Sequence, residues 1–123
     1  MIGNLPLGVT RTITKYGGIK HELNGKLHRE DGPAIEYCDA RFWYINGKIH
    51  RTDGPAAELS NGDKHWYING KLHRIDGPAV ENSDGSKEWY VKYEQITIEN
   101  YQNFIDDYPD LVNQFLAYSV LVR

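Results

Sequence analysis

The chain has 123 residues, a net charge of -3, 40% hydrophobic residues and 25% charged residues. This length provides one modest core and excludes a two-domain enzyme, and the composition is typical of a globular protein, not a disordered one. The acidic balance argues against direct binding to nucleic acid, because a protein that binds the phosphate backbone normally carries a basic excess.

The sequence also bears on location and redox chemistry. No apolar run approaches the roughly 20 residues of a membrane span, and Met1–Thr10 lacks the pattern of a signal peptide. We therefore expect a cytoplasmic protein without membrane contact. Cys38 is the single cysteine, which excludes an internal disulfide and a multi-cysteine zinc site.

The chain begins with elements that only partly match the later units. We expect an exposed edge strand near residues 9–16, and edge strands of this kind can pair with a second copy. Ile19–Leu23 then stands where later units carry an aromatic run, with His21 at the position of a tryptophan. These residues predict an incomplete first repeat.

One motif recurs three times with a period of 22 and then 23 residues. It reads Asn-Gly-Lys-(Leu/Ile)-His-Arg-x-Asp-Gly-Pro-Ala and covers residues 24–34, 46–56 and 69–79. Repetition at such a period is typical of a stack of equivalent structural units, each packed on its neighbours.

Within a unit the pattern predicts β-structure. In the second unit, Phe42–Ile45 is an aromatic and β-branched run, and Asn46-Gly47 favours a type I′ hairpin turn. Lys48–Arg51 forms the second arm, which Asp53-Gly54-Pro55 ends, because proline cannot donate to a ladder. A third short strand, Ala56–Leu59, leads to the next turn.

The last unit and the C-terminal segment end the repeats. Lys87–Val91 keeps the aromatic residues, but Lys92-Tyr93 replaces Asn-Gly, so the repeats are predicted to span residues 19–92. Residues 93–123 are predicted to form a helical cap: one helix from Ile98 to the Tyr108-Pro109 step and a second that carries Leu111, Val112, Phe115, Leu116 and Val120. The prediction is a mainly β, single-domain protein of residues 1–123, a β-meander or solenoid of hairpin repeats of 22–23 residues capped by two short C-terminal α-helices.

Hairpin geometry predicts which side chains share a face. A two-residue loop places Tyr44 opposite Ile49, Trp43 opposite His50 and Phe42 opposite Arg51. One face then carries rows of tryptophan (Trp43, Trp66, Trp89), histidine (His28, His50, His73) and lysine (Lys26, Lys48, Lys71). The other face carries tyrosine (Tyr44, Tyr67, Tyr90), Leu27, Ile49 and Leu72, and arginine (Arg29, Arg51, Arg74). The pattern leaves open which face is the core.

The Trp-Tyr-x-Asn-Gly-Lys-x-His-Arg-x-Asp-Gly-Pro-Ala units resemble MORN-variant repeats, in the short form found in large DNA phages and giant viruses. The resemblance covers residues 19–92. It implies a binding scaffold in which the tyrosine row is buried and the tryptophan, histidine and lysine face is the more open one. Partner or ligand binding is then expected at Trp43, Trp66, Trp89, His28, His50, His73, Lys48 and Lys71. The alternative is a packed tryptophan row with histidines as satisfied edge donors.

Catalysis is not indicated. A histidine precedes an aspartate by three residues in each full unit, and this repetition favours a structural bond from histidine or arginine to aspartate. Motifs for phosphate loops, nucleophile elbows and zinc helices are missing, so we expect a non-enzymatic protein without metal or cofactor.

Three functions fit these observations. The favoured one is a phage-encoded binding protein, located in the cytoplasm of the host cell, that inhibits a host defence protein by direct contact. The acidic C-terminal segment supports this interpretation, because it suits a basic surface. The alternatives are a protein that sequesters a nucleotide-type ligand and a structural module that assembles with copies of itself.

Overall fold

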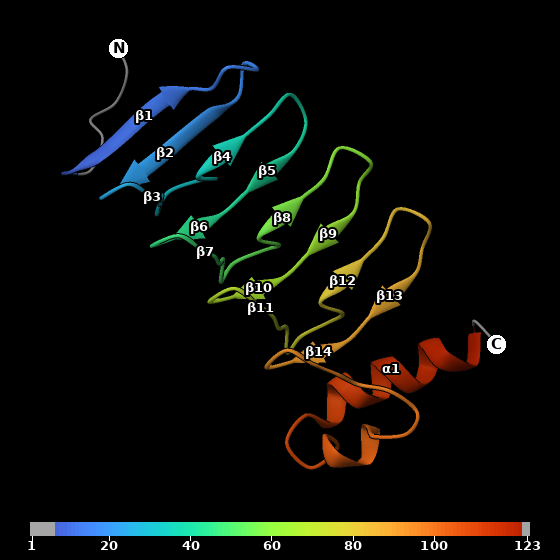
Figure 1. Cartoon of the computed structure of the whole chain (residues 1–123). Helices are drawn as coiled ribbons and strands as arrows, with labels where there is room; N and C mark the ends of the chain where they lie inside the picture. The colour runs from blue at the N-terminus through green and yellow to red at the C-terminus, as the bar shows by residue number, and fades with distance from the viewer. Residues whose placement is uncertain (1–6, 122–123) are drawn as a thin grey trace.

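A computed structural model describes residues 7–121 of the chain. The first six residues, which form part of the segment assessed for a signal peptide, lie outside the described residues. Figure 1 shows hairpins that follow one another in chain order, with a helix packed at the C-terminal end. The prediction of a mainly β meander is confirmed.

Nine strands form one antiparallel sheet. Its path is β1, β2, β4, β5, β8, β9, β12 and β13, and β3 also pairs with β2. Their bounds are β1 Val9–Ile13, β2 Ile19–Leu23, β3 Lys26–Leu27, β4 Ile35–Glu36, β5 Arg41–Phe42, β8 Ala57–Glu58, β9 Lys64–His65, β12 Val80–Glu81 and β13 Lys87–Glu88. The expected edge strand is β1, which pairs with β2 over its whole length.

Three two-stranded hairpins lie beside this sheet (Figure 1). They are β6 Tyr44–Ile45 with β7 Lys48–Ile49, β10 Tyr67–Ile68 with β11 Lys71–Leu72, and β14 Tyr90–Val91 with β15 Glu94–Gln95. Asn46 and Gly47 have φ angles of 49° and 80°, as a type I′ turn requires. The third hairpin continues to Gln95, three residues beyond the predicted end of the repeats at residue 92.

Successive hairpins are joined by backbone hydrogen bonds. The Arg51 N–H donates to the Tyr67 carbonyl at 3.1 Å, and the Gly70 N–H donates to the Ile49 carbonyl at 2.7 Å. The predicted pairing of Tyr44 with Ile49 is confirmed. The predicted pairing of Phe42 with Arg51 is wrong, because the chain leaves the large sheet at Trp43, and Phe42 pairs there with Ile35 and Ala57.

Fully buried alanines lie where each unit returns to the large sheet. Ala34, Ala56 and Ala79 each have 0% of their surface exposed. The Ala56 carbonyl accepts the N–H of Trp43 at 2.8 Å, and the Ala56 N–H donates to the His65 carbonyl at 2.9 Å. The alanine after Asp-Gly-Pro therefore links neighbouring units through its backbone, and its small side chain fits between them.

The C-terminal segment contains one α-helix, α1 Pro109–Leu121, and one short 3-10 helix, η1 Tyr101–Asn103. The first of the two predicted α-helices is thus reduced to a single turn. Asn100 explains the difference, because its side-chain oxygen accepts the Thr97 N–H at 2.7 Å and its amide donates to the Gln95 carbonyl at 2.8 Å. Such local bonds compete with helix formation.

The main hydrophobic cluster joins this segment to the last hairpin. Trp89, Val91 and Ile96 pack with four residues of the C-terminal segment, namely Phe104, Leu111, Val112 and Phe115. Of the stripe predicted for the second helix, Leu111, Val112 and Phe115 are buried, whereas Val120 is 67% exposed. The helix therefore closes the C-terminal end of the stack with residues from Leu111 to Tyr118.

Candidate functional site

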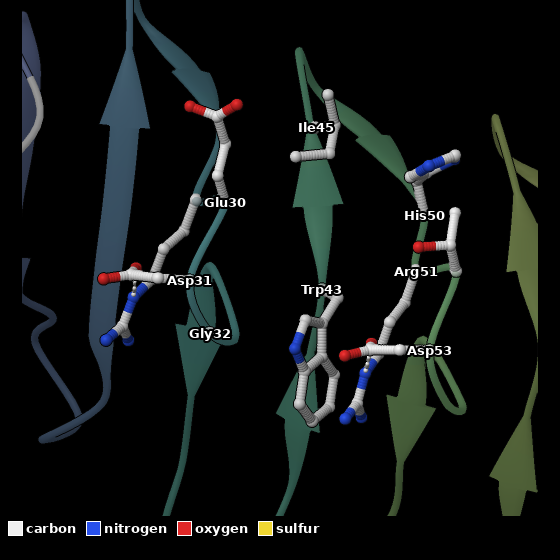
Figure 2. A pocket seen from close by; sticks show the side chains of 10 residues that line it. Glu30, Asp31, Gly32, Trp43, Ile45, His50, Arg51 and Asp53 are labelled. Atoms are coloured by element: carbon white, nitrogen blue, oxygen red, sulfur yellow. Dashed lines mark hydrogen bonds and ion pairs between the residues drawn. The ribbon is translucent and has the colours of Figure 1, made fainter.

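The repeated His-Arg-x-Asp-Gly-Pro motif holds an arginine guanidinium in one place. In the second unit, Arg51 Nε donates to Asp53 Oδ1 at 2.9 Å and Arg51 Nη1 donates to the Pro55 carbonyl at 3.1 Å. The Arg51 Cζ lies 4.0 Å from the centre of the Trp43 ring (Figure 2). This stacked position is favourable, because the ring face attracts a cation.

Glycine in the motif leaves space for the guanidinium. A Cβ added to Gly54 would lie 2.8 Å from Arg51 Cζ, closer than real side chains approach. The same short distance holds for Gly32 with Arg29, 2.8 Å, and for Gly77 with Arg74, 2.7 Å. In the second and third units the guanidinium therefore lies between the motif glycine and the tryptophan ring.

The third unit repeats this arrangement. Arg74 Cζ lies 3.9 Å from the centre of the Trp66 ring, and Arg74 Nε donates to Asp76 Oδ1 at 2.8 Å. Arg74 Nη1 also donates to Glu81 Oε2 at 2.8 Å. In the first unit, Arg29 keeps its bond to Asp31 at 2.9 Å, while His21 occupies the tryptophan position.

Two of the aspartates are held in the ionised form by their arginines. The hydrogen bond from Arg29 lowers the pKa of Asp31, and the hydrogen bond from Arg51 lowers the pKa of Asp53. A bond from histidine or arginine to aspartate was expected from the sequence, and the structure identifies arginine as the donor. The arginines are consequently neutralised within their own units.

Each motif histidine bonds to the next hairpin instead. The Nδ1 atoms of His28, His50 and His73 accept the backbone N–H groups of Asn46, Asn69 and Lys92 at 3.0, 3.0 and 2.8 Å. Burial, followed by the positive charge of Lys92, lowers the pKa of His73. A neutral histidine that accepts at Nδ1 carries its proton on Nε2.

Two open grooves lie between successive units. The first, of about 690 Å³, is lined by Trp43, Ile45 and His50 on one side and by the loop from Arg29 to Gly32 on the other (Figure 2). The second, of about 670 Å³, is lined by Trp66, Ile68 and His73 and by the loop from Arg51 to Gly54. Ile75, which is 58% exposed, lies at the second groove.

The third position in this series is filled by α1. Trp89, Val91 and Ile96 stand 23 residues after Trp66, Ile68 and His73, and all three are buried against the C-terminal segment. The ring of Trp89 lies 5.9 Å from that of Phe115 and 5.2 Å from that of Tyr118. Gln114 Nε2 donates to the carbonyl of Asp76 at 3.4 Å, so the helix also reaches the opposite loop.

A sequence change explains why the helix fits there. Thr97 stands where Arg51 and Arg74 stand in the earlier units, so no guanidinium lies over the Trp89 ring. Aromatic side chains of α1 pack on that ring instead. Ile96 likewise replaces the histidine and is only 2% exposed.

The predicted site residues therefore do not form a single site. Trp43 and His50 line the first groove, Trp66 and His73 line the second, and Trp89 belongs to the core beneath α1. His28 is buried, with 6% exposed. Lys48 and Lys71 line a hollow at the hairpin tips, which shares Ile68 and His73 with the second groove.

Arg51 and Arg74 are the groove residues that sequence reasoning missed. Strand alternation placed the arginines on the face opposite the tryptophans. The ladder ends at Ile49, however, and the chain beyond it turns so that the guanidinium reaches the tryptophan ring. The Asp-Gly-Pro sequence present in each full unit indicates this position of the arginine. Its aspartate carboxylate and proline carbonyl accept hydrogen bonds from the guanidinium, and its glycine leaves room for the guanidinium.

Metal-binding and membrane-spanning features do not occur in the described part of the chain. Residues 7–121 hold no cluster of three or more histidine, cysteine, aspartate or glutamate residues placed to bind a metal ion. No described helix is both long enough and apolar enough to span a membrane.

Comparisons with protein-family models, curated proteins and solved structures found no match. The resemblance to MORN-variant repeats stays a prediction from the sequence.

Proposed function

We propose that this chain is a non-enzymatic binding protein that holds a helical segment of a partner protein in its two open grooves. The observation that carries this proposal is the third groove position, which a helix of the chain itself fills. Trp89, Val91 and Ile96 contact α1 through the positions that Trp66, Ile68 and His73 present in the open second groove.

The chemistry of the open grooves suits a protein segment. The second groove presents the apolar Trp66, Ile68 and Ile75, which favour contact with an apolar side chain. Its two arginines, Arg51 and Arg74, are already bonded to aspartates, so the groove has little net charge. This balance favours an amphipathic helix over a strongly charged ligand.

The partner helix must differ from α1 in one respect. The guanidinium groups of Arg51 and Arg74 cover the tryptophan faces on which Phe115 and Tyr118 pack in the third position. A partner side chain therefore contacts the exposed edge of the guanidinium and the neighbouring isoleucine. Carboxylate or amide groups on the partner suit the guanidinium edge, because they accept its remaining hydrogen bonds.

The finer prediction, that the partner is a host defence protein inhibited on binding by a phage-encoded protein, rests on the resemblance and the acidic C-terminal segment. We propose this identity for the partner as well. The alternative is that the grooves bind a second copy of this chain, which the crosslinking experiment described next distinguishes.

Site-specific photo-crosslinking in a bacterial host tests the proposal. A photo-reactive residue at Thr52, which lines both grooves, should capture one discrete protein segment. Ile75→Asp should abolish capture, and Ile98→Asp is the matched control, since Ile98 is 50% exposed and does not line either groove.

The captured segment is then synthesised and titrated with the full chain. A gain in helical circular dichroism on binding supports the proposal. Capture that persists with Ile75→Asp, or a segment that binds in extended form, overturns it. Capture of a second copy of this chain would replace the foreign partner by self-assembly.

A further inference from the structure

The last hairpin turn contains residues that a type I′ turn normally avoids. Lys92 and Tyr93 have φ angles of 51° and 64°, in the left-handed region. The preceding three hairpins use Asn-Gly there, as at Asn46-Gly47, and this pair adopts such angles readily. A bulky residue with positive φ is strained. Turn formation alone therefore does not explain this pair.

The two replacements complete a cationic hollow. Lys92 joins Lys48 and Lys71 in the lining of this hollow, and Tyr93 adds an aromatic ring. The Lys71 Nζ lies 4.4 Å from the centre of this ring, and the ring residue is 63% exposed. The resulting hollow of about 410 Å³ is lined by Lys48, Lys71, Lys92, His73, Tyr93 and Ile68, with Asn69 at its wall.

Acidic groups do not neutralise this hollow. Within residues 7–121, its lining includes no carboxylate, and none of its three lysines forms an ion pair with one. The contrast with the grooves is clear, since Arg51 and Arg74 there bond to aspartates. In a chain of net charge -3, this is a local concentration of uncompensated positive charge.

His73 supplies a further donor. Its Nδ1 accepts the Lys92 N–H at 2.8 Å, so the neutral ring carries its proton on Nε2. The side chain lines the hollow. Three lysines and one histidine thus line a hollow beside an exposed aromatic ring.

We propose that this hollow binds a nucleotide, with the phosphates at Lys48, Lys71, Lys92 and the Nε2–H of His73, and with the base against the ring of Tyr93. Ammonium groups pair with phosphate oxygens through charge-assisted hydrogen bonds, and an aromatic face accepts a base by stacking. A volume of about 410 Å³ lies within the range of small-molecule sites. The site lies outside the Trp43 and Trp66 stacks and does not depend on a protein partner.

Isothermal titration calorimetry of the full chain at low salt tests this site. ATP, AMP and inorganic pyrophosphate are the probes. We expect saturable binding of ATP, and weaker binding both of AMP, which has fewer phosphates, and of pyrophosphate, which lacks the base.

The decisive variant is the double substitution Lys92→Asn with Tyr93→Gly, which restores the turn of the other hairpins. We expect it to weaken ATP binding by about tenfold or more and to raise the melting temperature, because the strained turn is relieved. Lys26→Ala is a control for the loss of one lysine, since Lys26 has in the first hairpin the place of Lys48 and Lys71 but lies outside the hollow. It should leave ATP binding unchanged.

Three results would overturn the proposal. They are the absence of saturable binding with ATP at about 1 mM, ATP binding that the double substitution leaves unchanged, and equal weakening by Lys26→Ala. A lower melting temperature of the double variant would assign Lys92-Tyr93 to packing of the last hairpin and would also count against a ligand site. The hollow shares Ile68 and His73 with the second groove, but neither variant changes a residue that lines a groove, so these results do not test helix binding.

Discussion

Gly54→Ala should destabilise the protein only while Arg51 is present. The added Cβ would lie 2.8 Å from Arg51 Cζ, so the guanidinium must leave its place over the Trp43 ring. The stacking contributes about 1 kcal/mol, and the hydrogen bond to the Pro55 carbonyl contributes about 1 kcal/mol. Gly54 does not have a positive φ, so alanine also reduces the entropy of the unfolded chain, by about 0.5 kcal/mol.

The net expectation is a loss of about 1.5 kcal/mol for Gly54→Ala in the natural chain. With Arg51→Ala already in place, the same substitution should be neutral or stabilising by about 0.5 kcal/mol. Urea unfolding of the four proteins of this double-mutant cycle, followed by tryptophan fluorescence, measures both values. An equal loss in the two backgrounds would show that Gly54 is needed for the backbone and not for the guanidinium.

Two further perturbations test other parts of the structure. Burial is the main cause that lowers the pKa of His73 and of His21 below the ordinary value of 6.5, so the unfolded chain binds protons that the folded chain does not. The stability that these two neutral histidines provide should therefore be fully present above pH 6.5 and should be lost as the pH falls toward their folded-state pKa values. In thermal melts, His73→Gln should show a smaller loss of stability over this pH range than the natural chain. Trp89→Ala, at a position that is 3% exposed, should reduce the free energy of unfolding by about 3–5 kcal/mol. Trp43→Ala, at a partly exposed position in an open groove, should reduce it by about 1–2 kcal/mol, and comparable losses in urea unfolding would contradict the placement of α1.

Much of the fold follows from local sequence rules. Asn46-Gly47 specifies the hairpin turn, and the pairing of Tyr44 with Ile49 follows from a two-residue loop. These features depend on residues close together in the chain. The predicted pairing of Phe42 with Arg51 was wrong, because it assumed one continuous strand. The chain instead passes at Trp43 from the large sheet to the row of hairpins.

The candidate site was harder to predict from the sequence, because it depends on residues that are far apart in the chain. Which side chains share a groove depends on contacts between units, such as the bond from His50 Nδ1 to the Asn69 N–H. Helix α1 covers Trp89 because Thr97 replaces the arginine of the earlier units. This replacement is visible only when the last unit is aligned with the others. After Ile98, the side chain of Asn100 bonds to the backbone and competes with helix formation. The spacing of apolar residues, on which the predicted helix was based, does not reveal this bond.

The histidine bonds have a consequence for the evolution of chain length. The Nδ1 atom of each motif histidine accepts its hydrogen bond from the hairpin that follows it, so this bond requires a unit to match its immediate neighbour and nothing further away. Duplication of residues 46–68 would add two strands to each row, lengthen the stack by about 9.6 Å and create one more groove. The helix would still close the far end. The number of grooves can thus change by whole units while the pattern of bonds between neighbouring units is kept.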